Sequence, residues 1–160
     1  MQTFGIRDEE FIRGKVPMTK AEIRAMVMVK AGIRPTDRVA DIGAGTGSIS
    51  IEAALAASEG DVYSIERNPE GIRLIEENAE KFGLKNIHTI QGTAPEAMDG
   101  LPPLNVVIIG GSSGNMHAIL DRAQELLPKG GRMVLTAVTA ETTGEVVREF
   151  QGRPFTLEGF

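Results

Sequence analysis

Three glycines stand at alternate positions in the stretch VADIGAGTGS, directly after a short apolar run. Gly43, Gly45 and Gly47 can adopt the positive φ angles of a tight loop and let a ligand approach bare backbone. The spacing departs from the G-x-G-x-x-G dinucleotide fingerprint, because Ser48 stands where the third glycine would fall, and no Gly-Lys-Ser/Thr follows. The loop is therefore typical of a nucleotide-type site without a pyrophosphate or triphosphate role.

Two acids accompany this loop. Glu66 ends the apolar stretch DVYSIE, 19 residues after Gly47, where a carboxylate can accept hydrogen bonds from both hydroxyls of a ribose. Asp41 lies just before the loop and could orient it, face a cofactor ammonium group or be a buried structural acid. We favour the cofactor-side role for Asp41, because a desolvated carboxylate needs a partner.

A second glycine-rich segment, IIGGSSGN, spans residues 108–115 and contains no acid, proline or aromatic ring. Ser112 and Asn115 within it, and His117 just beyond it, are weak candidates for catalysis, because a histidine is a generic acid–base group near neutral pH. His88 falls inside an expected strand, so we assign it a structural role. The chain has no cysteine, which excludes a disulfide scaffold, a zinc–cysteine site and a thiol nucleophile, and we expect no metal site.

Strand patterns alternate with helix patterns along the whole chain. We expect strands at 38–42, 61–66, 86–92, 105–110 and 132–138, and the start of a sixth at 154–160. We expect helices at 18–32, 48–58, 68–82, 116–127 and 141–150, with a short helical turn in 94–103. This order predicts an α/β protein with a mostly parallel sheet and helices on both faces. Ligands bind such sheets beyond the carboxyl ends of the strands, here after Ile42, Glu66, Gln91 and Ile109.

The first expected helix has a start signal and an apolar face. Thr19 and Glu22 have the spacing of a capping box, in which each side chain satisfies the other residue's free backbone N–H. The apolar positions at helical spacing are Ile23, Met26, Val27 and Ala31.

Length and composition suit one soluble domain, residues 1–160, with an N-terminal arm at 1–17. No apolar run approaches the roughly 20 residues that span a bilayer, and MQTFGIRDEEF is charged where a signal peptide is apolar, so we expect a cytoplasmic protein. The net charge of −5 argues against nucleic-acid partners. Residues 1–34 nevertheless carry seven Lys/Arg and four Asp/Glu, a local charge of +3, which would suit an anionic substrate.

The stretches VADIGAGTGSISIEAA and VYSIERNPEGIRLIEENAEKFG resemble the class I S-adenosylmethionine-dependent methyltransferases. The resemblance implies a Rossmann-like fold, S-adenosyl-L-methionine as cofactor and S-adenosyl-L-homocysteine as product. It places Thr93 where many members have an acid near the adenine amino group. The cofactor contacts that it implies are Thr19, Asp41, Gly43, Ala44, Gly45, Thr46, Gly47, Glu66, Arg67, Thr93 and Ala94.

Class I enzymes that methylate amino nitrogens often carry an Asn/Asp-Pro-Pro-aromatic motif after the fourth strand. The segment IIGGSSGN lacks every part of that motif. Its absence counts against amino-nitrogen methylation and against a flipped-base pocket, where stacking aromatic rings are expected.

A narrower resemblance covers essentially the whole chain. The arm RDEEF…PMTKAEIR, the stretch SIERNPE and VVIIGGSSGNM resemble the decarboxylating cobalt-precorrin C15-methyltransferases of cobalamin biosynthesis, which are related to the precorrin-6Y C5,15-methyltransferases. The resemblance implies methylation at C15 with loss of the ring C acetate as CO₂, and a homotetramer. It also implies that Thr19 closes over the cofactor.

Such a substrate is a large, flat polycarboxylate. Gly110, Gly111 and Ser112 would make room for it, and basic residues of the arm would supply countercharge, since arginine holds carboxylates through paired hydrogen bonds. The candidates are Arg13 and Lys15, with Arg7, Lys20 and Arg24 beside them.

Two alternatives remain open from the sequence: a tRNA adenine-N1-type methyltransferase, and a cofactor-binding subunit without catalysis. Class I sheets normally finish with a hairpin, and the chain stops at Phe160 as that hairpin should turn. We therefore expect an incomplete or covered sheet edge and association between copies, because an exposed edge invites pairing.

Overall fold

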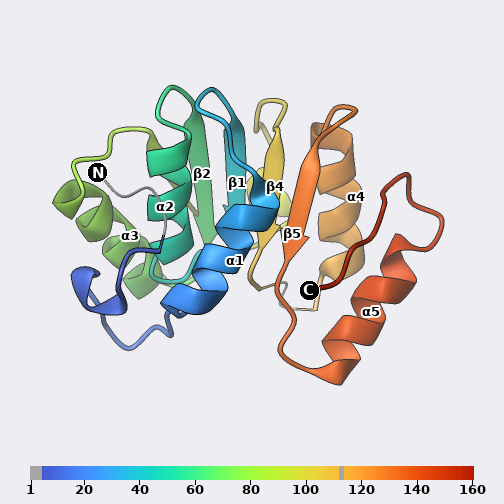
Figure 1. Ribbon diagram of the computed structural model, residues 1–160, viewed down its shortest axis with the longest axis horizontal. Coiled ribbons are helices and arrows are strands. Elements are labelled where there is room, and N and C mark those ends of the chain that lie inside the picture. Colours follow the sequence, from blue (N-terminus) through green and yellow to red (C-terminus); the bar gives the residue numbers. More distant parts are fainter. Residues whose placement is uncertain (1–4, 112–113) are drawn as a thin grey trace.

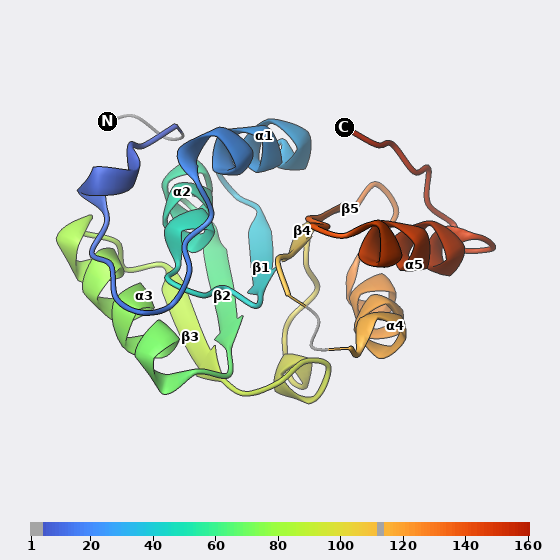
Figure 2. The same cartoon turned by 90° about the horizontal axis from the view of Figure 1, so that it is seen from below.

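The computed structural model describes residues 5–111 and 114–160, which form one parallel sheet between two layers of helices (Figures 1 and 2). The strands lie in the order β3-β2-β1-β4-β5, and every pairing is parallel. Their bounds are Arg38–Ile42 (β1), Asp61–Glu66 (β2), Ile87–Gln91 (β3), Val106–Ile109 (β4) and Arg132–Leu135 (β5). The strand order reverses between β1 and β4, and such a switch point is where α/β sheets bind ligands.

The helices cover both faces of the sheet, with α1, α2 and α3 on one side and α4 and α5 on the other (Figure 2). The α-helices are Ala21–Ala31 (α1), Ser48–Ala56 (α2), Pro69–Lys81 (α3), Met116–Leu126 (α4) and Ala140–Phe150 (α5). Two short 3₁₀ helices, Asp8–Glu10 (η1) and Glu96–Met98 (η2), complete the described elements. Among these residues, none of the helices combines the length and the apolar composition that crossing a bilayer needs.

Side chains of the central strands are buried on both faces of the sheet. Val39 and Ile108 pack with α1 and α2, whereas Ala40, Ile42 and Ile109 pack with α4. Continuous apolar strands of this kind are expected where helices cover both faces of a parallel sheet. The predicted alternation of five strands and five helices is confirmed.

The start and the buried face of α1 differ from the prediction. Lys20, not Thr19, precedes the helix, and the described residues show no side-chain cap there, so the capping box is wrong. Ile23 and Met26 are 49% and 44% exposed. Val27 and Ala31 are buried as predicted. The helix buries Met28 and the side chain of Arg24 in place of Ile23 and Met26, because its orientation is determined by packing against α2, the sheet and the N-terminal arm.

The predicted sixth strand at 154–160 is also wrong, because residues 155–160 have no regular secondary structure. The Phe155 amide donates to the Arg153 carbonyl at 2.8 Å, and the Phe155 ring packs edge-on against Phe150, with ring centroids 5.7 Å apart. This turn directs the chain back over α5. The segment beyond it reaches α1, where Lys30 pairs with Glu158.

Candidate functional site

A cavity of about 200 Å³ opens at the carboxyl ends of the strands. Ligand binding is expected at this end of a parallel α/β sheet. Its walls come from the ends of β1 and β2, the loops after β3 and β4, and one side chain of α4. The lining residues are Ile42, Gly43, Ile65, Glu66, Arg67, Gly92, Thr93, Ala94, Gly111 and Ile119.

The glycine loop lies against the loop that follows β4. The Gly43 amide donates to the Ile65 carbonyl at 2.9 Å, and the Gly110 amide donates to the Ile42 carbonyl, also at 2.9 Å. Gly43 has a φ of 73°, and a Cβ added there would lie 2.8 Å from the Gly111 backbone nitrogen. Only glycine fits this approach, so the two glycine-rich segments found in the sequence form adjoining parts of one site.

Glu66 connects the end of β2 to the glycine loop. Its carboxylate accepts hydrogen bonds from the Gly45 amide at 2.7 Å and from the Asn68 amide at 3.0 Å, one on each oxygen. Two backbone donors therefore fix the orientation of the carboxylate, and each oxygen keeps a second lone pair for a ligand hydroxyl.

Asp41 lies behind the loop, with a relative exposure of 1%. Its carboxylate accepts a 2.6 Å hydrogen bond from the Ser50 hydroxyl, which accepts another of 2.6 Å from the Ser64 hydroxyl. Burial raises the pKa of Asp41 to about 6, against the opposing effect of the hydrogen bond from Ser50. The side chain contacts α2, and it is not among the described residues that line the cavity. The partner of the Asp41 carboxylate is therefore Ser50 of the protein itself, which is the arrangement of a buried structural acid.

The loops after β3 and β4 meet at the other side of the cavity. Thr93 and Ala94 line it there. The Asn115 side-chain amide, just before α4, donates to the Ala94 carbonyl at 3.3 Å. Gly111 lies on the cavity wall, whereas the candidate Ser112 lies outside the described residues.

The basic residues of the arm and of α1 that were candidates for substrate binding differ in exposure. Arg13 and Lys15 are exposed, so their charges are available to an anionic ligand. Arg24 is fully buried: its guanidinium lies 3.2 Å from Glu52 and donates to the carbonyls of Ile6 at 2.6 Å and Thr19 at 2.5 Å. The idea that Arg24 supplies countercharge to a substrate is therefore wrong.

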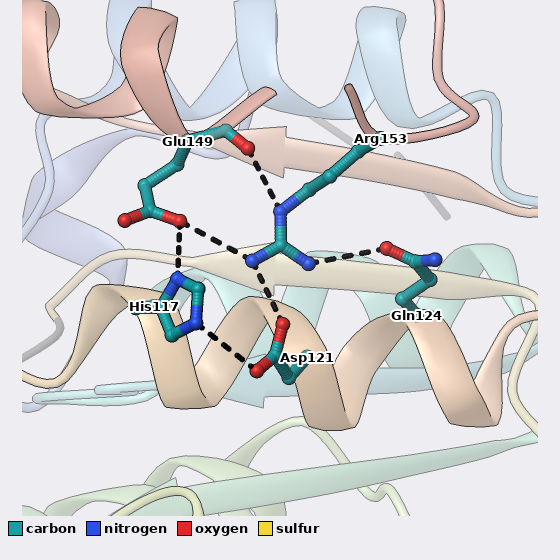
Figure 3. Close-up of polar contacts among 5 residues, drawn as sticks. All are labelled: His117, Asp121, Gln124, Glu149 and Arg153. Atoms are coloured by element: carbon teal, nitrogen blue, oxygen red, sulfur yellow. Dashed lines mark hydrogen bonds and ion pairs between the residues drawn. The ribbon is translucent and has the colours of Figure 1, made fainter. Parts of the chain in front are cut away.

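His117 lies in a separate, open groove between α4 and α5 (Figure 3). Its Nδ1 is 2.7 Å from Glu149 and its Nε2 is 3.3 Å from Asp121. The hydrogen bond to Glu149, followed by the charge of Asp121, raises the pKa of His117 above its ordinary value. Arg153 joins the same two carboxylates and Gln124 (Figure 3). The structure does not bring His117 into the cavity wall.

Several residues of the site escaped the sequence analysis. Ile42 and Ile65 were recognised as strand residues but not as cavity walls, although their place at the ends of buried strands was a usable signal. Asn78 was missed altogether. It stands on the buried face of α3 beside Leu74 and Ile75, where a polar residue within an apolar stripe signals a specific hydrogen-bonding task.

Comparisons with known proteins agree with this geometry. The model of a family described as a precorrin methyltransferase domain matches residues 10–154. The cobalt-precorrin-6B C(15)-methyltransferase (decarboxylating) of Salmonella typhimurium is 42% identical over 137 residues, which cover 85% of this chain and 70% of that protein.

Solved structures give the same result. The precorrin-6y C5,15-methyltransferase of Geobacter metallireducens superposes with a TM-score of 0.93 at 36% identity, covering 98% of this chain and 84% of that one. The precorrin 8W decarboxylase of Methanobacterium thermoautotrophicum superposes with a TM-score of 0.88 at 35% identity, covering 94% and 82%. The expected Rossmann-like class I methyltransferase fold is confirmed. The chain therefore belongs to the precorrin methyltransferase domain family and is an enzyme of methyl transfer.

Proposed function

We propose that this enzyme uses S-adenosyl-L-methionine to methylate C15 of a cobalt-precorrin and decarboxylates the acetate on ring C, as a step of cobalamin biosynthesis. The observation that carries the proposal is the pairing of the two glycine loops. One loop fits the cofactor, and the other offers an uncharged floor beside it. The names of the similar proteins from Salmonella typhimurium and Methanobacterium thermoautotrophicum support both halves of the reaction.

The residues at the cavity suit this cofactor. Gly43 and Gly45 present bare backbone, and the Glu66 carboxylate is oriented to accept hydrogen bonds from the hydroxyl groups of a ribose. When bound, the cofactor supplies an electrophilic methyl group on a sulfonium. We assign the ribose to Glu66 and the adenine to Thr93 and Ala94. The remaining contacts proposed for the cofactor are Thr19, Ala44, Thr46, Gly47 and Arg67.

The acceptor side needs little chemistry from the protein, because a conjugated macrocycle brings its own electrons. Methyl transfer from a sulfonium is an in-line displacement, so the main task of the enzyme is to hold donor and acceptor close and aligned. We propose that Gly110, Gly111 and Ser112 leave room for the ring. Arg13 and Lys15 bind its carboxylates, since both are exposed on the arm.

The test is incubation with the cobalt-precorrin substrate and S-adenosyl-L-methionine, followed by mass spectrometry. We expect a product that has gained one methyl group and lost CO₂. A product that gains a methyl group and keeps its acetate would contradict the decarboxylation. Methylation of tRNA under the same conditions would contradict the assigned substrate.

We also propose that the enzyme acts as a homotetramer in the cytoplasm, with residues 1–160 as one domain. The exposed apolar side chains Ile23, Met26 and Val29 on α1 support association between copies. Light scattering coupled to size-exclusion chromatography tests the assembly: a monomeric mass at micromolar concentration would contradict it.

A further inference from the structure

The structure extends the N-terminal arm, predicted at 1–17, to residue 20 just before α1, and residues 5–20 lie along the outer side of the glycine loop and α3. Ile6 and Phe11 are buried against Ile51, and the buried Arg24 binds the two ends of the arm through the Ile6 and Thr19 carbonyls. The middle of the arm needs a different attachment, because residues 12–19 lie outside the helices and strands.

That attachment is the side chain of Asn78 on α3, which is fully buried. Its Oδ1 accepts a hydrogen bond from the Ile12 amide at 2.8 Å. Its Nδ2 donates to the Ile12 carbonyl at 3.1 Å and to the Thr46 carbonyl at 3.3 Å. One side-chain amide thus joins the backbone of the arm to the backbone of the glycine loop.

The arm stays in contact with the loop beyond this point. A Cβ added to Gly45 would lie 3.4 Å from the Pro17 carbonyl oxygen and 3.8 Å from Val16 Cγ1. The Lys15 amide donates to Glu70 at 3.3 Å, near the start of α3. Gly45 is the residue whose amide binds Glu66, so the arm supports the part of the loop that orients this carboxylate.

We propose that Asn78 is a positioning residue for the cofactor, acting by locking the arm and the Gly43–Gly47 loop into one arrangement. An asparagine is suited to this task, because its amide offers an acceptor and two donors at a single point. Aspartate keeps only the acceptor, and a small apolar residue leaves three backbone groups without their partner. This inference rests on the proposed use of S-adenosyl-L-methionine.

A matched control exists at the opposite end of the sheet. The Asn86 side-chain amide, just before β3, donates to the carbonyls of Ala54 at 3.1 Å, Ala57 at 2.9 Å and Gly60 at 3.4 Å. Its loss also removes three hydrogen bonds to backbone, but far from the carboxyl ends of the strands. Asn78→Ala and Asn86→Ala therefore separate a loss of stability from a loss of positioning.

The first measurement is calorimetric titration of S-adenosyl-L-methionine, at a temperature where circular dichroism shows each variant to be folded. We expect Asn78→Ala to raise Kd about tenfold and Asn86→Ala to leave it within about twofold. Equal affinities for wild type and both variants would show that Asn78 is only structural and would overturn the inference. If Asn78→Ala does not fold, Asn78→Ser is used, since its hydroxyl is small and uncharged, and the same rise in Kd is expected.

The second measurement needs no cofactor. Amide hydrogen exchange should accelerate at Ile12 and Gly45 together in Asn78→Ala, and at neither residue in Asn86→Ala. If wild type does not bind S-adenosyl-L-methionine, the proposed function fails. The exchange result still tests whether Asn78 couples the arm to the glycine loop. Faster exchange at Ile12 with unchanged exchange at Gly45 would contradict the lock between arm and loop.

Discussion

Two arginines hold chain segments in place at opposite sides of the sheet, and they do so in different ways. Arg24 on α1 is fully buried, beside a Glu52 side chain that is also fully buried, and it donates to backbone carbonyls. Arg153, after α5, has a side chain that is 10% exposed, and it binds Asp121 at 2.8 Å and Glu149 at 3.2 Å, whose side chains are 53% and 22% exposed (Figure 3). The first arrangement lies in the protein interior and the second at the surface.

The difference shows where the fold of this enzyme is least tolerant of mutation. Breaking a buried ion pair leaves an uncompensated charge out of water, whereas water and salt replace much of an exposed pair. The arm and the glycine loop depend on the buried arrangement around Arg24 and Asn78. The packing of α5 against α4 depends on the more exposed ion pairs of Arg153 with Asp121 and Glu149. We therefore expect mutations near the cofactor end to cost more than mutations around α5.

Arg24→Ala should have the largest effect on folding. It leaves the Glu52 carboxylate buried without its counter-charge and frees the arm, for a loss of about 3–5 kcal/mol in the free energy of unfolding. Arg153→Ala, the matched variant, should lose only about 1 kcal/mol. Urea denaturation of both proteins measures the contrast, and equal losses would remove the distinction between the two regions.

Gly43→Ala should come next. The variant forces a φ of 73° on alanine and brings its Cβ to 2.8 Å from the Gly111 backbone nitrogen. We expect a loss of about 2 kcal/mol in the free energy of unfolding and no detectable cofactor binding. Gly32→Ala is the control, because Gly32 also has a positive φ, of 53°, but a Cβ there meets no described atom within 4 Å. It should cost about 1 kcal/mol and leave cofactor affinity unchanged.

Glu66→Gln should weaken cofactor binding with little change in stability. The amide keeps the size of the side chain, but its NH₂ group faces a backbone donor, either the Gly45 or the Asn68 amide. We expect a loss of about 2 kcal/mol in binding free energy, measured by calorimetric titration. Glu76→Gln is the control, since Glu76 contacts Thr89 on the outside of the sheet. Unchanged affinity in Glu66→Gln would argue against the ribose assignment.

The smallest effect concerns pH and α5. The pKa of His117 is raised by Glu149 and Asp121, so its contribution to stability is complete below its ordinary value of 6.5 and is lost as pH rises through the raised value. The pKa of Glu149 is lowered, mainly by the hydrogen bond from His117. Its contribution is present above 4.5 and is lost as pH falls through the lowered value. The α4–α5 contact should thus be strongest between about pH 4.5 and 6.5.

Amide hydrogen exchange of α5 measured from pH 5 to pH 8, after correction for the intrinsic pH dependence of exchange, checks this expectation. Protection should fall toward pH 8 in wild type and change less in His117→Gln, which keeps a polar side chain without the titrating charge. Identical profiles for the two proteins would show that the His117 contacts do not hold α5.

Local patterns predicted much of the fold and part of the site. Short apolar runs identified the five strands, and helical spacing identified the five helices. At the start of α3, expected at 68–82, the Asn68 side chain accepts from the Glu70 amide at 3.0 Å. The predictions failed at Thr19 and at residues 154–160. In both places long-range packing outweighed a local signal: the arm and Arg24 at the first, Phe150 and Phe155 at the second.

The sequence by itself determined the chemical character of the enzyme, because Gly43, Gly45, Gly47 and Glu66 are needed for reasons that lie within a few residues of each: positive φ, bare backbone and a carboxylate at a strand end. Only the tertiary structure decided which polar groups support them. Asn78 lies 32 residues from Thr46 and 66 from Ile12, and Arg24 lies 28 from Glu52. Hydrogen bonds across such separations depend on how the helices pack on the sheet, and no local pattern records that packing.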